Sequence, residues 1–587
     1  MPIVDLIAPQ ALSFRQDTIV FGDQVGAVLV VTDYPPRVGP AWLEQLAKLP
    51  GVSLSMQIAP ADTLELVSAL NKSIVEFQSR LAAQSGQPLQ KERSAQSLQD
   101  AKELMRKIDQ ESHRVFRVAV FLLVLGRDEQ ELRQRIRRVE GASAAAGMRA
   151  RAATFRQEQA LLSAGPWAVF HREMNEAVGR EMPAETIAAA YPWVTSGLNH
   201  GRGCLWGRDS QGGVVLIDRW NRPPDSGMAN ANSNILGTSG ARKSTTEKIV
   251  LLREYALGAR IIILDPEREY RSICRQLGGT WINAAGGQGK VNPLHISPIP
   301  DSYDEEDGED SAEVARSPLA RKMQRLKAFF GLYLRSLDDL ERALLEDAIL
   351  AAYAAFGVTW DTDPASVAKW PTLADVRRHV SAMAGGERVG ILLKSATEGA
   401  DSHLWQGQTA IPAGGDFIVF DLHELMDAAE NVRRAQYFTI LGYAWDMVRE
   451  GRAHGARTHL LSDETWILAD PQTPEALAFL RDLSKRIRKY GGSLNVSTQN
   501  IGDFFSPELA RFGKPVIDNA SVKFLMRQEA GDLEVLRSLL HLSDAEAELL
   551  GNAPPGEGLL IAGNQRVKLR VEPSPYELEL LGIVPDA

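Results

Sequence analysis

The sequence predicts an α/β protein in two parts, in which a mixed α+β domain precedes a larger domain built around a parallel sheet. Two observations support this fold class. From about Gly213 onward, short β-branched apolar runs alternate with helical periods, as in β-α-β units. Before that point, longer strands alternate with charge-rich helices. We expect domains at residues 1–205 and 206–587, with a helical insertion at about 310–415 in the second.

Length and composition limit the protein class. The 587 residues suggest two to four domains at roughly 150 residues each. A net charge of −10 argues against wholesale coating of nucleic acid, although a local basic groove remains compatible with it. The content of 24% charged and 44% hydrophobic residues excludes disordered and fibrous proteins. Only two cysteines, Cys204 and Cys274, exclude a disulfide framework and favour reducing cytosol.

The elements of the first part follow from periodicity. We expect strands over residues 25–32, 52–58 and 115–125, and helices over 62–81, 91–112 and 128–140. The charged helices favour a solvated face over a nucleic-acid surface. The apolar run at 118–125 is too short to span a membrane, and the first residues lack a secretory pattern. We therefore expect a cytoplasmic protein that reaches a membrane only through partners.

The second part contains a series of buried strands. We expect strands over residues 214–218, 234–236, 260–264, 417–421, 458–462, 493–498 and 522–526. Two further runs, 557–562 and 567–571, flank Gly563-Asn564 and predict a hairpin. Ahead of the helical insertion lies the acidic tract 301–310, DSYDEEDGED. Such a tract favours a solvated loop over a metal or partner site.

A glycine-rich segment lies between the strand that ends at Leu236 and a helix predicted over 243–256. Its sequence is Gly237-Thr238-Ser239-Gly240-Ala241-Arg242-Lys243-Ser244-Thr245. Strand, glycine-rich turn and helix form the context of a P-loop, whose backbone N–H groups hold phosphates at the helix N-terminus. In that interpretation Lys243 reaches the β- and γ-phosphates of ATP and Ser244 binds Mg²⁺.

Arg242 departs from the P-loop pattern, which requires glycine before the lysine. Glycine is needed because the backbone passes close to the phosphates, so arginine strains the loop or crowds the nucleotide. The other matching positions favour a degenerate P-loop over a glycine-rich turn that binds no nucleotide. Arg242 also predicts reduced hydrolysis.

Four residues downstream of the loop, Asp463, Glu464, Gln499 and Arg488, fit the hydrolysis of a bound nucleotide. Asp463 and Glu464 end the strand at 458–462, where the first would hold the water shell of Mg²⁺ and the second would polarise the attacking water. Gln499, at the end of the strand predicted beside the nucleotide strand, could sense the γ-phosphate. Arg488 precedes that strand, and two interpretations weigh equally: a finger that enters a neighbouring subunit, or an exposed helix end.

At this point the chain resembles the VirB/TrbE/CagE family of traffic ATPases of conjugation and type IV secretion, within the wider HerA/FtsK group of P-loop motors. Besides the P-loop, the resemblance rests on ILDPEREY (263–270), VNPL (291–294), DETW (463–466), RKYGG (488–492) and TQNIGD (498–503). It covers most of the chain. It implies a RecA-like P-loop ATPase domain with a helical insertion, preceded by an α+β docking domain.

The resemblance also implies cofactors and partners. They are ATP with Mg²⁺, further copies of the chain in a hexamer, and channel components at the cytoplasmic face of the inner membrane. The ATPase would power channel assembly or substrate transfer. Two alternatives stay open: a HerA/FtsK-like DNA translocase, which needs basic pore loops, and a scaffold that lost turnover through Arg242. Glu267 and Glu269 could reach the nucleotide, but Asp-Pro-Glu there favours a turn.

Overall fold

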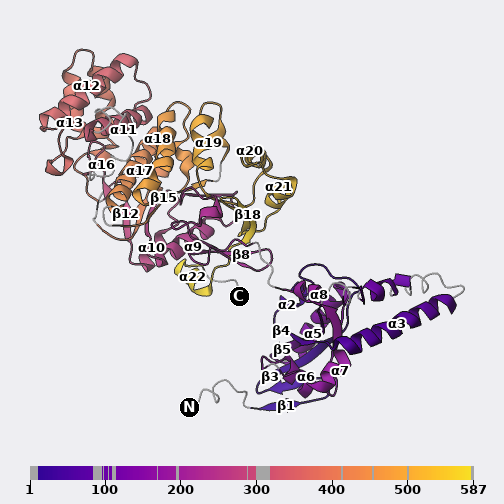
Figure 1. The fold of residues 1–587 in the computed structure, drawn as a ribbon. Helices are drawn as coiled ribbons and strands as arrows, with labels where there is room; N and C mark the ends of the chain where they lie inside the picture. The colour runs from indigo at the N-terminus through magenta and orange to yellow at the C-terminus, as the bar shows by residue number, and fades with distance from the viewer. Residues whose placement is uncertain are drawn as a thin grey trace. The chain divides into compact units, whose positions relative to one another are not determined.

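The chain forms two compact units in the computed structural model, with the division between residues 194 and 195. The structure describes residues 11–83, 95–96, 98–103, 105–106, 108, 114–167, 169–192, 197–286, 289–298, 317–411, 414–452, 455–498 and 501–583. Figure 1 gives the elements of both units. The boundary expected at 205/206 falls inside the first strand of the second unit, Cys204–Asp209. The acidic tract 301–310 and part of the helix expected over 91–112 lie outside the described residues.

The first unit is an antiparallel sheet with helices packed on it. The strand order is β1-β2-β3-β5-β4, with β6 paired to β3 and β7 to β5. The strands are β1 Leu12–Phe14, β2 Ile19–Phe21, β3 Gln24–Asp33, β4 Val52–Pro60, β5 Val115–Gly126, β6 Arg149–Ala152 and β7 Arg180–Pro183. The helices are α2 Glu44–Ala47, α3 Thr63–Ala83, α5 Glu129–Ala145, α6 Gln157–Ala164, α7 Arg172–Val178 and α8 Ala184–Ala188. Strands β1, β2, β6 and β7 were not predicted from the sequence.

The second unit is built on an eleven-stranded sheet in the order β12-β13-β11-β14-β15-β10-β16-β17-β18-β8-β9. The pairs from β12 to β16 are parallel, and those from β16 to β9 are antiparallel. The strands are β8 Cys204–Asp209, β9 Val214–Ile217, β10 Ser233–Leu236, β11 Arg260–Asp265, β12 Thr280–Asn283, β13 Phe417–Asp421, β14 Thr458–Ser462, β15 Gly492–Thr498, β16 Val522–Leu525, β17 Glu557–Ala562 and β18 Gln565–Arg570. The predicted parallel sheet and hairpin are confirmed, whereas β8 and β12 were not predicted.

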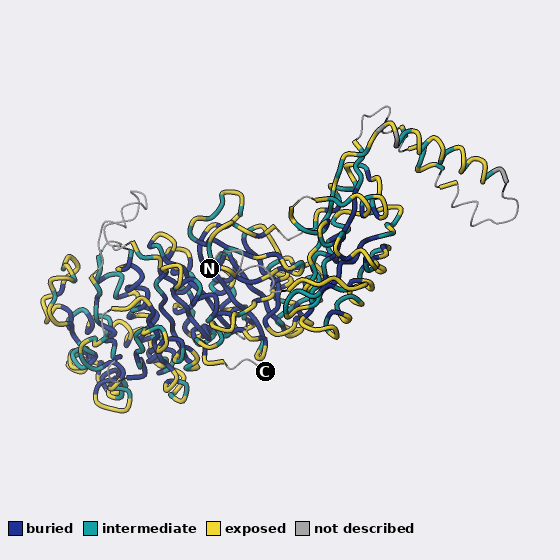
Figure 2. Tube along the Cα trace, turned by 90° about the horizontal axis from the view of Figure 1, so that it is seen from below, coloured by how far each residue is buried: buried dark blue, intermediate teal, exposed yellow. Residues whose placement is uncertain are grey.

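Helices cover both faces of this sheet, which explains why its central strands are apolar without alternation. In β11, Ile261 and Ile263 pack into one core with α9, while Ile262 and Leu264 pack into the other core with α17. The helices are α9 Lys243–Ala256, α10 Arg271–Gln276, α17 Glu430–Arg452, α18 Pro474–Arg486, α19 Ala510–Asp518, α20 Ala530–Leu540, α21 Asp544–Gly551 and α22 Pro575–Leu580. Figure 2 shows the buried residues running along the strands and the inner helix faces.

The helical insertion lies between β12 and β13. It contains α11 Pro318–Tyr333, α12 Asp339–Ala355, α13 Leu373–Ala382, α14 Glu387–Leu392, α15 Lys394–Thr397 and α16 Ser402–Trp405. Short 3₁₀ helices connect other elements: η1 Pro224–Ser226, η5 Pro364–Ser366, η6 His423–Asp427, η7 Thr465–Leu468, η8 Ile487–Tyr490 and η9 Gly502–Phe505. The predicted insertion is confirmed. Over the described part of the chain, no helix has the length and apolar content needed to cross a membrane.

The strand order brings the functional segments to one edge of the sheet. Strand β15 lies between β10 and β14 and is parallel to both. The segments that follow parallel strands leave the sheet at the same edge. The glycine-rich loop after β10 and the carboxylates after β14 therefore face each other across the end of β15.

Candidate nucleotide-binding site

The glycine-rich loop joins β10 to α9 in a conformation that two glycines permit. A Cβ on Gly237 would lie 2.9 Å from the Cβ of Met526, closer than side chains normally approach. Gly240 has a φ of +79°, a region that glycine adopts without strain. The other predicted residues of the segment are placed in order: Thr238, Ser239 and Ala241 lie in the loop, and Ser244 and Thr245 lie in the first turn of α9.

Arg242 is the N-cap residue of α9 and takes a left-handed backbone conformation, with φ 66° and ψ 33°. Its side chain makes no capping hydrogen bond to the helix, and the residue is exposed. A residue with a Cβ in this region costs roughly 1–2 kcal/mol, whereas glycine does not. The position therefore favours glycine for a backbone reason, and Arg242 keeps the loop geometry at that cost.

Lys243 is buried and points its ammonium group into a cluster of oxygens. Its Nζ donates a hydrogen bond to Ser497 Oγ at 2.6 Å and lies 3.5 Å from Asp463 Oδ1 and 3.4 Å from Glu464 Oε1. Burial alone would lower the pKa of Lys243, but the nearby carboxylates outweigh it and raise this pKa above its ordinary value. The structure thus brings together Lys243, Asp463 and Glu464, which are far apart in the sequence.

Neighbouring side chains hold the backbone of Asp463 and the carboxylate of Glu464. The Tyr437 hydroxyl donates to the backbone oxygen of Asp463 at 2.7 Å, and Trp466 Nε1 donates to Glu464 Oε2 at 2.8 Å. Glu464 takes a left-handed conformation with a φ of 47°. A strained non-glycine residue that is held by its neighbours is common at functional sites. The contact with Trp466 and the backbone conformation together position the carboxylate of Glu464.

Glu247 is a third buried carboxylate of this cluster, and sequence reasoning missed it. The residue is 3% exposed, and the Tyr270 hydroxyl donates to its Oε2 at 3.1 Å. Burial, and then the charge of Asp463, raise the pKa of Glu247 to about 8. Its position one helical turn after Lys243 was the available signal, because residues four apart share a helix face.

The acidic groups of the cluster outnumber its ammonium group. Asp463, Glu464 and Glu247 surround one lysine, and burial raises the pKa of Asp463 above its ordinary value. Glu247 is largely protonated near pH 7, so Asp463 and Glu464 are the two carboxylates that face Lys243, and their oxygens are of the kind that suits Mg²⁺. No group of three His, Cys, Asp or Glu side chains among the described residues could hold a metal by itself.

Asp265, at the end of β11, shapes the turn that follows. Its carboxylate accepts hydrogen bonds from the backbone N–H groups of Glu269, at 3.0 Å, and Tyr270, at 2.9 Å. Glu267 is exposed, and Glu269 pairs with Lys248 at 3.2 Å. The contacts match the interpretation of this segment as a turn. Burial raises the pKa of Asp265 to about 7.

Arg488 does not join the Lys243 cluster. It lies in η8, ahead of β15, is exposed, and donates from Nη1 to the backbone oxygen of Ala229 at 3.4 Å. Ser497 is near the opposite end of β15, so the length of the strand, roughly 20 Å, separates Arg488 from the cluster in its own chain. Gln499 lies outside the described residues.

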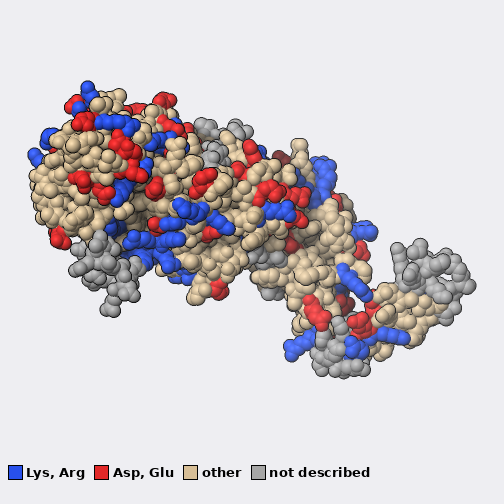
Figure 3. Space-filling view, turned by 90° about the horizontal axis from the view of Figure 1, so that it is seen from above, with Lys and Arg blue, Asp and Glu red and all other residues tan. Residues whose placement is uncertain are grey.

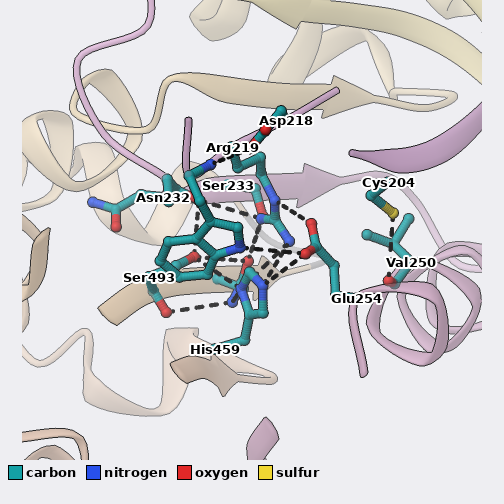
Figure 4. Close-up of polar contacts among 12 residues, drawn as sticks. Cys204, Asp218, Arg219, Asn232, Ser233, Val250, Glu254, His459 and Ser493 are labelled. Carbon is teal, nitrogen blue, oxygen red and sulfur yellow. Dashed lines mark hydrogen bonds and ion pairs between the residues drawn. The ribbon is translucent and has the colours of Figure 1, made fainter. Parts of the chain in front are cut away.

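A second polar network lies at the opposite ends of the same strands and centres on Arg219, which is fully buried (Figure 4). Its Nε donates to Glu254 Oε1 at 3.0 Å, and its Nη1 donates to Asn495 Oδ1 at 2.9 Å and to Ser233 Oγ at 3.0 Å. His459 Nε2 is 3.3 Å from Glu254 Oε2. The network joins the last turn of α9 to the first residues of β10, β14 and β15.

The charges of this network are tightly coupled. Burial, and then the neighbouring Arg219, lower the pKa of His459 to about 4, so His459 is neutral near pH 7. Burial would raise the pKa of Glu254, but Arg219 and His459 hold it below its ordinary range. The helix that follows the glycine-rich loop is therefore anchored at its far end by an ion pair between Arg219 and Glu254.

Comparison with known proteins finds one matching family model, a similar solved structure and two similar proteins. The family model for the TraG P-loop domain matches residues 205–314 and 414–552, the two segments around the insertion. The solved structure of VirB4 of Thermoanaerobacter pseudethanolicus is 48% identical, covers 65% of this chain and 100% of that chain, and has a TM-score of 0.60. An uncharacterized protein of Bacillus anthracis is 20% identical over 99% of this chain and 96% of its own length. Protein TraC of Escherichia coli is 23% identical over 52% of this chain, which spans a third of that protein.

Proposed function

Because the chain belongs to the VirB4 family of P-loop ATPases of type IV secretion and conjugation, we propose that it binds ATP with Mg²⁺ and hydrolyses it to power channel assembly or substrate transfer. The site is the loop 237–245 with the carboxylates after β14. The protein works as a homo-oligomer, a hexamer by family resemblance, attached peripherally to the cytoplasmic membrane through other channel components.

The convergence of Lys243, Asp463 and Glu464 carries this proposal. The ammonium group of Lys243 is held at the N-terminus of α9, where a helix favours phosphate. Mg²⁺ supplies positive charge to the phosphates when it is bound. Glu464 is the general base, since its carboxylate lies beside Lys243 and is oriented by Trp466. Asp463 and Ser244 hold the metal with its water shell.

Lys243 has carboxylate and hydroxyl partners, and this arrangement bears on turnover. Its ion pairs with Asp463 and Glu464 are partial, at 3.4–3.5 Å, and its one short contact is to Ser497. When phosphates enter, the ammonium group exchanges these partners for phosphate oxygens. Asp463 would then hold Mg²⁺, and Glu464 would orient the attacking water.

A scaffold with impaired hydrolysis is the second candidate function, and Arg242 is the observation that favours it. Its left-handed backbone belongs to a position suited to glycine. In this alternative the chain keeps the fold and the binding of ATP, and hydrolysis is slow. The two candidates differ in turnover but agree on the role of Lys243.

Substitution of Lys243 tests the assignment of the nucleotide site. Lys243→Ala leaves the phosphate charge unpaired, so we expect loss of ATP affinity or of turnover. The matched control is Lys248→Ala, which removes a lysine from the same helix, where it pairs with Glu269. Binding of a fluorescent ATP analogue and release of phosphate are measured on both purified variants. Equal binding and hydrolysis in Lys243→Ala and the parent would contradict the site.

A further inference from the structure

A large groove lies between the helical insertion and the rest of the second unit. It has a volume of about 940 Å³ and is lined by residues of α11, α12, α17 and α18. This is at the upper end of the size range of ligand sites, roughly 300–1,000 Å³. The residues of the Lys243 cluster and of the Arg219 network do not line it. The groove therefore has no part in nucleotide binding.

The floor of the groove is apolar. Met323 and Phe330 of α11, Ile349 of α12 and Trp445 of α17 are each under 10% exposed, and Phe479 of α18 is partly buried. Large aromatic side chains at the bottom of a concave surface are typical anchors of an interface. The floor is thus suited to an apolar side chain or to the apolar face of a helix.

The walls of the groove carry a positive excess. Seven Lys or Arg residues line it against four Asp or Glu residues, in a chain whose formal charge is −10. Ion pairs hold some of the basic side chains: Arg325 with Asp446 at 2.8 Å and Lys327 with Glu346 at 3.0 Å. In Figure 3, Lys and Arg side chains gather beside the helical insertion. The groove therefore favours an acidic ligand.

Two arginines of the groove are free to meet such a ligand. Arg342 on α12 and Arg486 at the end of α18 are exposed, and neither side chain makes an ion pair or a hydrogen bond within the described residues. The Nε group of Arg335, in the same wall, is buried without a hydrogen-bond partner among the described residues.

We propose that this groove is a docking site for an amphipathic acidic helix of a partner protein. The apolar face of that helix lies on Met323, Phe330 and Trp445, and its carboxylates pair with Arg342 and Arg486. A nucleic acid fits the groove less well, because an apolar floor offers nothing to phosphates. Complementary charge at the rim around an apolar centre is the usual arrangement of a protein interface.

A peptide of defined composition tests the proposal on the full chain. The probe, called the Glu peptide, is a labelled synthetic helix of about four turns with Leu on one face and Glu on the other. The control, called the Lys peptide, has Lys in place of every Glu. Binding is followed by fluorescence anisotropy without nucleotide, so the outcome is independent of the Lys243 experiment. We expect the Glu peptide to bind at least about tenfold more tightly than the Lys peptide.

Variants of the rim locate the binding. In the double variant Arg342→Glu/Arg486→Glu, the Glu peptide should bind about tenfold more weakly and the Lys peptide more tightly. The control Arg378→Glu reverses an exposed charge on α13, outside the groove, and should leave both affinities within about twofold of the parent. Circular dichroism verifies that each variant is folded.

Four results would overturn the proposal. Equal affinity for both peptides would exclude charge recognition, and unchanged affinity in the rim variant would place binding elsewhere. Rim-dependent binding of a short DNA duplex without binding of the Glu peptide would assign the groove to nucleic acid. If deletion of residues 301–310 made the Glu peptide bind more tightly, the occupant of the groove would be the chain's own acidic tract.

Discussion

Arg242 shows how one residue can retain a loop and still affect its chemistry. Its left-handed φ of 66° is a backbone cost that arginine and alanine share and that glycine avoids. Its positive charge attracts phosphate in the ground state and in the transition state alike, so the charge need not accelerate hydrolysis. Backbone strain and side-chain crowding are therefore separable by substitution.

We predict that Arg242→Gly hydrolyses ATP several-fold faster than the parent. The glycine removes both the strained Cβ and the long side chain, whereas the matched variant Arg242→Ala removes only the long side chain. Steady-state phosphate release from the three purified proteins distinguishes the causes: strain predicts that only the glycine variant gains, and crowding predicts that both gain. If neither is faster, the loop accommodates arginine productively and the scaffold function loses its support.

Glu464 is the residue on which the chemistry depends. We predict that Glu464→Gln binds ATP with the affinity of the parent and hydrolyses it at least ~100-fold more slowly, the usual effect of losing a general base. Nucleotide binding and single-turnover hydrolysis are measured side by side. Glu475→Gln, an exposed glutamate at the start of α18, is the control and should keep full turnover. Unchanged turnover in Glu464→Gln would shift the role of the base to Glu247 or Glu269.

At the scale of elements, α9 is held at both ends. Its N-terminus carries Lys243 against Asp463, and its last turn carries Glu254 against Arg219. Breaking one partner of a buried ion pair leaves an uncompensated charge, which is strongly destabilising. The Arg219 network therefore holds α9 rigidly against β10, β14 and β15, the three strands whose ends form the candidate nucleotide site.

The network predicts a pH dependence of stability. Below pH 6.5 the unfolded His459 takes up a proton, whereas the folded His459, with a pKa of about 4, does not. The free energy of unfolding therefore decreases as the pH falls from 6.5 toward 4, and His459 contributes about 2 kcal/mol of this loss between pH 7 and pH 5.

Other groups titrate in the same range, so the test is a difference between two proteins. His459→Gln lacks the titrating group and should lose about 2 kcal/mol less than the parent between pH 7 and pH 5. Denaturant unfolding at the two pH values, followed by tryptophan fluorescence, measures both losses. Identical losses would mean that His459 titrates similarly in the folded and unfolded states.

At the scale of the whole molecule, the position of Arg488 requires a second copy of the chain for its proposed role. The length of β15 separates it from the cluster of its own chain, so it can act as a finger only at the site of a neighbour. We predict that inactive Arg488→Ala subunits mixed with inactive Lys243→Ala subunits regain part of the ATPase activity. Some interfaces then combine an intact loop with an intact arginine.

The control for this mixing experiment is the double variant Lys243→Ala/Arg488→Ala. Mixed with Lys243→Ala subunits, it provides no intact loop, so no activity should return. Light scattering verifies that the subunits co-assemble. Absence of recovery in the first mixture, despite co-assembly, would favour the alternative in which Arg488 belongs to an exposed helix end.

The sequence by itself determined the elements and the fold class. Helix α9 begins and ends where periodicity predicts, at Lys243 and Ala256, and β13, β14 and β17 have their predicted bounds. The RecA-like fold with its helical insertion is confirmed. These features were predictable because they are local: apolar runs, glycine-rich turns and helical periods are set by neighbouring residues. Short strands were predicted less consistently: β12 was missed, whereas β10, of the same length, was expected.

Only the tertiary structure decided which side chains meet. The placement of β15 between β10 and β14 brings Ser497 to Lys243, and the pairing of β15 with β10 joins segments more than two hundred residues apart. The fold also buries Glu247 beside Asp463 and closes Arg219 on Glu254. Spacing places Glu247 on the helix face of Lys243, but its burial beside Asp463 and the pairing of Arg219 with Glu254 are settled by packing of the whole chain. The sequence names Lys243 and Asp463 as candidate site residues, whereas their partners and the shifts of their pKa come from the fold.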